Sequence, residues 1–333
     1  MPSCRFDVLG IGNAIVDVIS RTGDDFLAAQ GLRKGAMTLI DEARAEALYK
    51  AMGTATFVSG GSAANTIIGA ASLGCRAAFI GKLKNDETGA AFAHDIRAAK
   101  VDFSTALAKD GPASGRCLVL VTPDGQRTMN TFLGAAQSLS EADVEEHLVT
   151  QSAIVYLEGY LWDPPAAKAA FVKAANIARG AARRVALTLS DSFCVDRYRE
   201  EFLALIRSGS VQIVFANESE LHSLYQTGDF DTAATQLRTE NILAVVTRSE
   251  RGSLVVTRDE VLAVPAFPVG LVVDTTGAGD LFAAGFLAGL SKNKDLETCA
   301  RLGALAAAEI IQHIGARPLT DLGQLAAQNG IAI

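Results

Sequence analysis

The regular alternation of short apolar runs with amphipathic segments is the feature that most constrains the fold of this chain. Strand-like runs are FDVLGIG, ATFVSG, AAFIGKL, AIVYLEGY, VALTLSD, VQIVFANE and ILAVVTR. Helical patterns such as PPAAKAAFVKAANIARG and RYREEFLALIRSG lie between many of them. Strands that alternate with helices predict β-α-β units, and therefore an α/β fold with a mainly parallel central sheet that is buried on both faces. Ligands of such sheets bind at the edge where the strands end.

Two stretches interrupt this alternation, at about 14–39 and 113–133. The second contains GRCLVLVTPDGQRTMNTFL, in which two strand patterns flank the turn signal PDGQ. We expect the two stretches to meet in space as a small β-rich lid, discontinuous in sequence. The whole chain, 1–333, is then one catalytic domain that carries this lid.

Composition excludes several functional classes. Hydrophobic residues make up 49% of the chain, the net charge is −7, and no long run of Lys or Arg is present. We therefore expect neither a nucleic-acid nor a membrane partner. The five cysteines are scattered and no signal-peptide pattern is evident, which indicates a cytoplasmic protein. Its oligomeric state, monomer or homodimer, is left open by the sequence.

The segment GIGNAI, residues 10–15, follows the first strand and begins like a dinucleotide-binding fingerprint. Its third glycine is replaced by Ile15, and the following AIVDVIS reads as a further strand. A dinucleotide site is therefore disfavoured. The chain contains no G-x-x-x-x-G-K-[ST], which excludes a P-loop.

The stretch DTTGAGDLFAAGFLAGL, residues 274–290, places one acid at the start of an apolar helix. Gly277, Ala278 and Gly279 allow a sharp turn that leaves backbone N–H groups uncovered, which makes an anion site. Asp280 could be an N-cap only. Alternatively, a phosphoryl group binds the amides while Asp280 faces the hydroxyl that receives it.

Four stretches together resemble the ribokinase-type (PfkB) family of sugar and nucleoside kinases. They are GGSAANTIIGAASLG, NESE, TRSERGS and DTTGAGD, which occur in the family's order and span nearly the whole chain. The resemblance implies a ribokinase-like three-layer α/β/α sandwich and an ATP-dependent phosphotransferase. TRSERGS departs from the family pattern because Ser249 stands at its first glycine.

The resemblance also implies roles for individual residues. Asp280 would be the catalytic base, with the amides of Ala278, Gly279 and Asp280 as the anion hole. The substrate's hydroxyls would be bound by Asp17, Gly60, Gly61 and Asn65. ATP would contact Asn217, Thr247, Ser249, Gly252, Gly277 and Gly279. Mg²⁺ would be held through water by Asn217 and Glu220, and a monovalent cation, K⁺, by Asp274, Thr276 and Gly315.

Each of these residues also has a purely structural interpretation. Gly60 and Gly61 could only turn a strand into a helix. Asn217 and Glu220 could form a capping box. Asp17 could be an ordinary strand residue, and Asp274 could cap a turn.

For the substrate, GNAIVDV resembles the opening of adenosine kinases, which adds Asn13 to the expected pocket. The adjoining flap segment offers Met37 and Leu39 to a flat base, and EGYLW offers Tyr160 and Leu161. Arg127 would reach the phosphate. The resemblance therefore implies phosphorylation of a nucleoside 5′-hydroxyl, most simply that of adenosine in purine salvage. A kinase of ribose or fructose, a binding homologue without turnover, and a packing role for Met37, Leu39 and Tyr160 are the alternatives.

Overall fold

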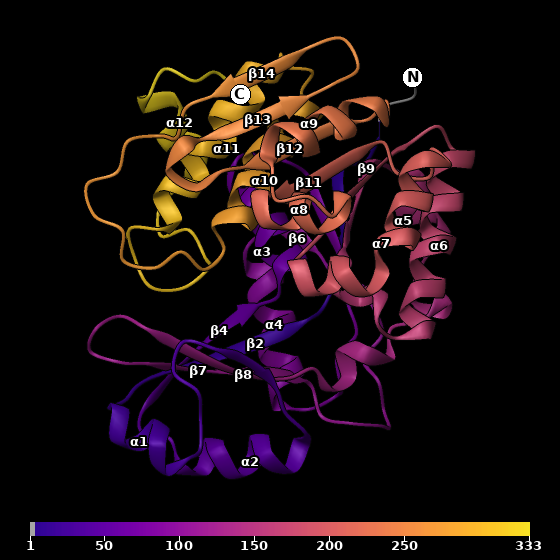
Figure 1. Cartoon of the computed structure of the whole chain (residues 1–333). Helices are drawn as coiled ribbons and strands as arrows, with labels where there is room; N and C mark the ends of the chain where they lie inside the picture. Colours follow the sequence, from indigo (N-terminus) through magenta and orange to yellow (C-terminus); the bar gives the residue numbers. More distant parts are fainter. Residues whose placement is uncertain (1–3) are drawn as a thin grey trace.

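The computed structural model describes residues 4–333 (Figure 1). Its strands are β1 (Phe6–Ile11), β2 (Ile15–Arg21), β3 (Met37–Leu39), β4 (Ala55–Gly60), β5 (Ala77–Ile80), β6 (Val101–Asp102), β7 (Gly115–Val121), β8 (Arg127–Phe132), β9 (Ser152–Glu158), β10 (Arg184–Thr188), β11 (Ile213–Asn217), β12 (Leu243–Thr247), β13 (Ser253–Val256) and β14 (Val261–Val264). Its α-helices are α1 (Asp24–Ala29), α2 (Glu42–Ala51), α3 (Ser62–Ser72), α4 (Glu87–Ala98), α5 (Glu146–Thr150), α6 (Pro165–Gly180), α7 (Ser192–Arg207), α8 (Glu218–Tyr225), α9 (Phe230–Thr239), α10 (Ala278–Ser291), α11 (Leu296–Ile310) and α12 (Leu322–Gln328). Four short 3₁₀ helices are η1 (Gly134–Ser138), η2 (Glu141–Asp143), η3 (Gly159–Trp162) and η4 (Ser249–Arg251).

Nine strands form the large sheet, in the order β14-β13-β12-β11-β10-β9-β1-β5-β6. All neighbours from β6 to β12 pair in parallel, and the antiparallel pairs are β12 with β13 and β13 with β14. The expected mainly parallel sheet is therefore confirmed. After β1 the chain enters β2 without a helix between them, so the helix that a dinucleotide fingerprint requires is missing there.

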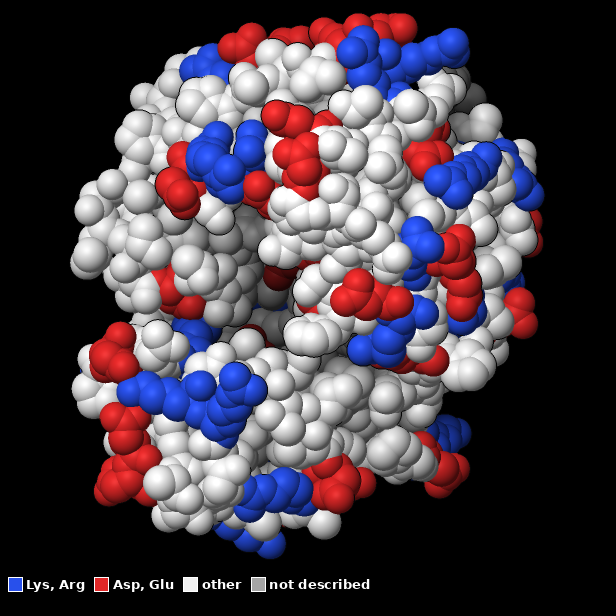
Figure 2. Space-filling model, in the orientation of Figure 1, with Lys and Arg blue, Asp and Glu red and all other residues white. Residues whose placement is uncertain are grey.

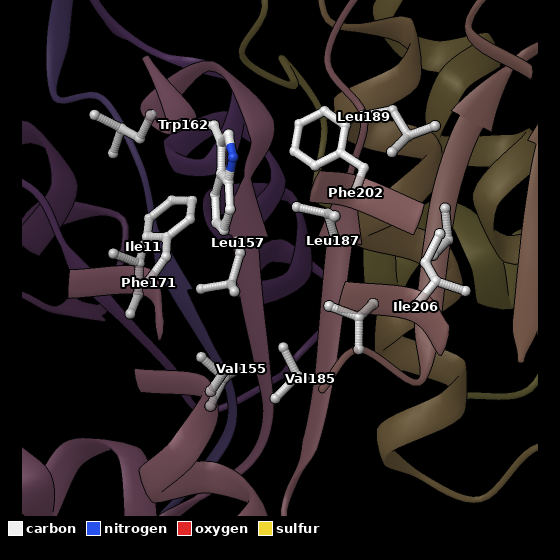
Figure 3. Close-up of a cluster of buried hydrophobic side chains, with 14 of the residues drawn as sticks. Ile11, Val155, Leu157, Trp162, Phe171, Val185, Leu187, Leu189, Phe202 and Ile206 are labelled. Atoms are coloured by element: carbon white, nitrogen blue, oxygen red, sulfur yellow. The ribbon is translucent and has the colours of Figure 1, made fainter. Parts of the chain in front are cut away.

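Helices cover both faces of the large sheet, which gives the expected three layers. One hydrophobic cluster packs α5, α6, α7, α8 and α9 against one face, and a second packs α3, α4, α10 and α11 against the other. Figure 3 shows the first cluster, where Trp162, Phe171 and Phe202 surround Leu157 and Leu187 of the adjacent strands β9 and β10. Among residues 4–333, no helix is both long and apolar enough to cross a membrane.

A second sheet of five strands has the order β3-β8-β7-β2-β4 and lies below the large sheet in Figure 1. It draws on both stretches that interrupt the alternation, but it also takes β4. The prediction that placed ATFVSG among the strands of the alternating core was therefore wrong, because β4 pairs antiparallel with β2. A six-residue β pattern carries no information about which of two sheets it will join.

The register of the small sheet gives it two different faces. Val16, Val18, Leu118 and Leu120 point one way, where they pack with Leu27 of α1 and Leu48 of α2. Successive side chains of a strand point to opposite sides, so the residues between these four, and their partners on neighbouring strands, lie on the opposite face of the small sheet. That opposite face carries Asp17, Ile19, Cys117, Val119, Arg127, Met129, Met37 and Leu39.

The layered core predicts a sharp contrast between two neighbouring residues of α6. Phe171 is fully buried, whereas Val172 is 41% exposed. Phe171→Ala should lower the free energy of unfolding by about 3–5 kcal/mol, because it removes a large side chain and leaves a cavity. Val172→Ala serves as the control in the same helix, measured in the same urea titration. Equal losses in the two variants would contradict this assignment of the core.

Candidate active site

A hollow lies between the large body and the small sheet, and both acidic and basic side chains are visible inside it (Figure 2). On the large body, this region contains the start of α10. Gly277 caps that helix with φ of +79°, and a Cβ at this position would lie 2.8 Å from the Cβ of Ala316. Glycine is required there for both reasons.

The first turn of α10 leaves two backbone donors free. The N–H of Ala278 donates to the carbonyl of Thr275 at 3.2 Å. Within the described part of the chain, the N–H groups of Gly279 and Asp280 have no acceptor, and Gly279 borders open space. This helix start therefore has the free donors and the dipole that suit an anion.

Asp280 lies in the first turn of α10 and does not cap it. Its Oδ1 accepts a hydrogen bond from the Ser62 hydroxyl at 2.7 Å, and its Oδ2 accepts one from Asn65 Nδ2 at 2.9 Å. The interpretation of Asp280 as a mere N-cap is therefore wrong, since Gly277 holds that position. Sequence analysis did not single out Ser62, although it lies beside the expected glycine pair.

The glycine pair brings the expected substrate residues together. Gly61 has φ of +96°, and a Cβ there would overlap the carbonyl oxygen of Asn13. A Cβ on Gly60 would lie 2.6 Å from a carboxylate oxygen of Asp17. Because α3 begins directly after this pair, Asn65 follows on its first turns and reaches Asp280.

Burial perturbs the acids in this region. Desolvation raises the pKa of Asp17 to about 6, although Arg317 and Arg127 act to lower it. Desolvation also raises the pKa of Asp280, opposed by the hydrogen bonds from Asn65 and Ser62 and then by the charge of Arg317.

Arg317 is a residue that sequence analysis missed. Its guanidinium donates to the carbonyl of Ser59 at 2.7 Å and to the carbonyl of Ala64 at 3.0 Å, on either side of the glycine pair. Burial lowers its pKa to about 10, opposed by the charges of Asp95, Asp17 and Asp280. Arg317 lies in the irregular segment between α11 and α12, far in the chain from its partners, so no local pattern marks it.

Glu158 is a second missed residue. It ends β9, is 1% exposed and accepts a hydrogen bond from Asn13 Nδ2 at 2.6 Å. Desolvation raises its pKa to about 7, opposed by hydrogen bonds from Ala63 and Asn13. A lone acid at the end of an apolar strand run was the available signal, because the ends of parallel strands line the ligand edge.

Asp274, Thr276 and Gly315 do meet, but a side chain supplies the positive charge beside them. Arg127 forms an ion pair with Asp274, and its Nη1 donates to Thr276 Oγ1 at 2.8 Å. Asp274 also accepts from the N–H of Gly315 at 2.9 Å and of Thr276 at 3.0 Å. In this conformation the carboxylate is neutralised by Arg127, so it does not fit a monovalent cation, and Arg127 is not free to reach a phosphate.

Asn217 and Glu220 form the capping box that was one of the two interpretations of this pair. The Asn217 side chain accepts from Glu220 N at 2.9 Å, and Glu220 accepts from Asn217 N at 3.0 Å. Glu220 also accepts from Asn217 Nδ2 at 2.6 Å. Desolvation raises the pKa of Glu220 to about 7.

Four of the residues expected at ATP, namely Asn217, Thr247, Ser249 and Gly252, lie at the ends of β11 and β12 or in the turn after β12. Asn217 pairs in register with Thr247, so both stand at strand ends. Ser249 has φ of +52°, in the left-handed region that the family's glycine adopts without steric cost. Gly252 has φ of +84°, and a Cβ there would overlap the carbonyl oxygen of Val264. The backbone thus keeps a glycine-like conformation at Ser249.

Met37 and Leu39 lie on the Asp17 face of the small sheet, where they are 47% and 57% exposed. Met37 is in register with Met129, which is in register with Val119. These side chains, with Ile19, form an apolar stripe beside Asp17.

Tyr160 and Leu161 are placed differently from one another. The Tyr160 hydroxyl donates to the carbonyl of Ser190 at 3.2 Å. Leu161 is 1% exposed and belongs to the hydrophobic cluster of Figure 3. The expected contact of Leu161 with a base is not supported, because its side chain serves the core.

Comparisons with known proteins agree with this geometry. The sequence model of the pfkB family carbohydrate kinases matches residues 36–321. The solved structure of an adenosine kinase from Sinorhizobium meliloti is 54% identical, with a TM-score of 0.92, and the match covers 98% of this chain and 99% of that one. The structure of a probable sugar kinase protein from Rhizobium etli CFN 42 is 51% identical, with a TM-score of 0.94, covering 99% and 100%. An adenosine kinase of Saccharomyces cerevisiae is 27% identical over 327 residues, covering 92% of this chain and 94% of its own length. The chain belongs to the pfkB family of carbohydrate kinases.

Proposed function

We propose that this kinase transfers the γ-phosphoryl group of ATP to the 5′-hydroxyl of a nucleoside, with adenosine as its substrate. One observation carries the proposal. The Asp280 carboxylate is fixed by Ser62 and Asn65 directly beside the free N–H groups of Gly279 and Asp280. A base and an anion hole in one helical turn are what phosphoryl transfer to an alcohol requires.

Three groups of residues have separate roles in the proposed reaction. Asp17, Asn65 and the backbone at Gly61 bind the ribose hydroxyls and so aim the 5′-hydroxyl at Asp280. Asp280 accepts the proton as the new O–P bond forms. The amides of α10 stabilise the charge that develops on the transferred group.

ATP and Mg²⁺ are the cofactors of this proposal. The described residues hold no group of three or more His, Cys, Asp or Glu that could bind a metal ion. Mg²⁺ keeps most of its waters and often enters with nucleotide phosphates, so it does not need a protein cage. Glu220 and Asn217 stand at the correct sheet edge to orient such waters, and bound Mg²⁺ would offset phosphate charge. A potassium ion could bind Asp274 only if Arg127 left it, so no monovalent cation takes part in the proposed reaction. Kinase activity should therefore be the same in K⁺ and in Na⁺.

The apolar stripe favours a nucleoside over a free sugar. Met37, Leu39 and Met129 offer an apolar surface on the face of the small sheet that also carries Asp17, which suits a planar base attached to a bound ribose. A free sugar offers polar groups on every face and has no use for such a surface. One close relative is described as an adenosine kinase and another as a probable sugar kinase, so a sugar kinase is the second candidate.

We further propose that the small sheet acts as a lid, built around residues 14–39 and 113–133 and extended by β4. Closing it would bring the stripe over the base and exclude water from the phosphoryl group.

Asp280→Asn should lower kcat for adenosine by roughly 10²–10⁴-fold, because the amide cannot accept the hydroxyl proton. ATP affinity should change little. Asp295→Asn is the control, since Asp295 is a true N-cap, of α11, and asparagine caps equally well. An Asp280→Asn enzyme that keeps more than about a third of wild-type kcat would refute the role of Asp280 as the base.

Activity and stability should respond to pH in opposite directions. The raised pKa values of Asp17, Glu158 and Glu220, about 6, 7 and 7, mean that the native state binds more protons than the unfolded state between about pH 4 and 7. Their contribution to stability is therefore present at low pH and is lost as pH rises through the folded pKa values. Activity should instead rise through pH 6–7, because an ionised Asp17 accepts hydrogen bonds from the ribose hydroxyls more strongly than a protonated one.

Thermal unfolding of the ligand-free protein from pH 5 to 8, beside kcat/KM over the same range, tests both halves. Glu220→Gln removes one of these groups, so its Tm should fall less steeply with pH than that of the wild type. An identical slope in the two proteins would count against the raised pKa of Glu220.

Adenosine should be preferred over ribose and fructose by about a hundredfold or more in kcat/KM, since burying a base contributes a few kcal/mol and each 1.4 kcal/mol is about tenfold. Met37→Asp should erode that preference by placing a charge against the base. Val261→Asp is the matched control, because Val261 is 48% exposed on the edge strand β14. If ribose or fructose outcompetes adenosine in a coupled ADP-release assay, the sugar-kinase candidate replaces this one.

A further inference from the structure

Two buried asparagines each face a carboxylate through their amide nitrogen. Asn13 Nδ2 donates to Glu158 Oε1 at 2.6 Å, and Asn65 Nδ2 donates to Asp280 Oδ2 at 2.9 Å. An ionised carboxylate only accepts hydrogen bonds, so above the raised pKa of Glu158, about 7, the Asn13 amide must turn its nitrogen toward the carboxylate and its oxygen away. Asn65 is turned in the same way toward Asp280. Both Oδ1 atoms are buried and lack a hydrogen-bond partner within the described part of the chain.

The seat of Glu158 is built to hold its carboxylate in one orientation. Oε2 accepts from the backbone N–H of Ala63 at 2.9 Å and from that of Asn13 at 3.3 Å. Gly12 makes room for it, since a Cβ at Gly12 would overlap Oε2. Every donor on Glu158 therefore comes from the segment just after β1 or from the start of α3, the two segments that border the expected ribose site.

We propose that Glu158 is a positioning residue for the substrate, which locks the Asn13 amide so that its Oδ1 accepts a hydrogen bond from a hydroxyl or amino group of the nucleoside. This inference rests on the proposed function. Asn13 Oδ1 has no access to solvent in this conformation, so the side chains around it have to shift for a donor of the substrate to reach it.

Because the Asn13 amide is held in one orientation, it selects substrates that present a hydrogen-bond donor to its oxygen. A substrate that presents a donor completes the hydrogen bonding of Asn13. A substrate that presents only an acceptor, or an apolar group, leaves a buried oxygen unsatisfied, which weakens binding by roughly 5- to 100-fold. If Asn13 could rotate, its nitrogen could meet acceptors equally well and this discrimination would be lost.

Binding measured without ATP tests the proposal independently of turnover. The probes are adenosine and four analogues that each lack one donor: 2′-deoxyadenosine, 3′-deoxyadenosine, 5′-deoxyadenosine and N6-dimethyladenosine. For the wild type, at least one analogue should bind roughly tenfold or more weakly than adenosine. Glu158→Gln should weaken adenosine binding by a similar factor but should weaken that one analogue much less, since the bond lost is the same.

Glu309→Gln is the matched control. Glu309 is also a buried acid, and it accepts hydrogen bonds from Leu319 N, Thr320 N and Thr320 Oγ1 and contacts His313, but it has no contact with Asn13. Its substitution should affect all five ligands alike. If Glu158→Gln also weakens all five ligands by the same factor, Glu158 is only a structural support and the proposal is overturned.

A reciprocal exchange keeps the test decisive if Glu158→Gln fails to fold. Asn13→Asp alone sets two buried carboxyls against each other, which would share a proton at neutral pH. Its nucleoside binding should therefore weaken steeply as pH rises and that proton is lost, whereas wild-type binding should not. In the double variant Asn13→Asp/Glu158→Gln, the new amide nitrogen can donate to the new carboxylate, and the amide oxygen can still accept from Ala63. The second oxygen of the new carboxylate then again faces the substrate as an acceptor.

The double variant should therefore recover adenosine binding to within about tenfold of the wild type, with the same ranking of the analogues. A double variant no better than Asn13→Asp, or one with a different ranking, overturns the proposal. If the wild type binds adenosine but does not phosphorylate it, the proposed kinase reaction fails while this inference stands or falls on the binding data.

Discussion

The arrangement of the cleft depends on the two hydrogen bonds that join α3 to Asp280. They connect the element that carries the glycine pair to the helix whose first turn carries the free amides. The contacts of α3 with α10 continue along both helices, where Gly69 is small enough to admit Leu281 and Ala284. Because the two helices share a packed interface, the Asp280 carboxylate, the free amides and the turn at Gly60 and Gly61 are held in one relative position.

The second constraint is electrostatic. Asp17, Asp280, Glu158 and Glu220 are acids in desolvated positions, and the protein as a whole is negative. Such groups remain tolerable only where hydrogen bonds or cations offset the loss of water. Arg317 acts on Asp17 and Asp280, while Arg127 pairs with Asp274. An incoming polyphosphate therefore meets local donors at the start of α10 within an unfavourable overall field.

Features that depend on local sequence were predictable. The alternating pattern predicts the parallel sheet, and the glycines before Asp280 predict the exposed amides, because both follow from periodicity and backbone freedom. The assignment of β4 to the small sheet depends on its pairing with β2, which no local pattern specifies. Arg317 lies 258 residues from Ser59, so its contribution exists only in the folded chain. Glu158 is intermediate between these cases, since its place at a strand end was visible but its partner Asn13 was not.

The continuity of β4 with α3 has a mechanical consequence. The last residue of this small-sheet strand is Gly60, and α3 begins two residues later. The chain thus passes from β4 in the small sheet, through two glycines, directly into α3, whose side chains hold Asp280. A rotation of the small sheet would therefore change the backbone conformation at Gly60 and Gly61 or move α3. If the small sheet closes as proposed, its motion would reach α3 through the glycine pair, so that enclosure of the substrate and the position of the Asp280 carboxylate would be coupled.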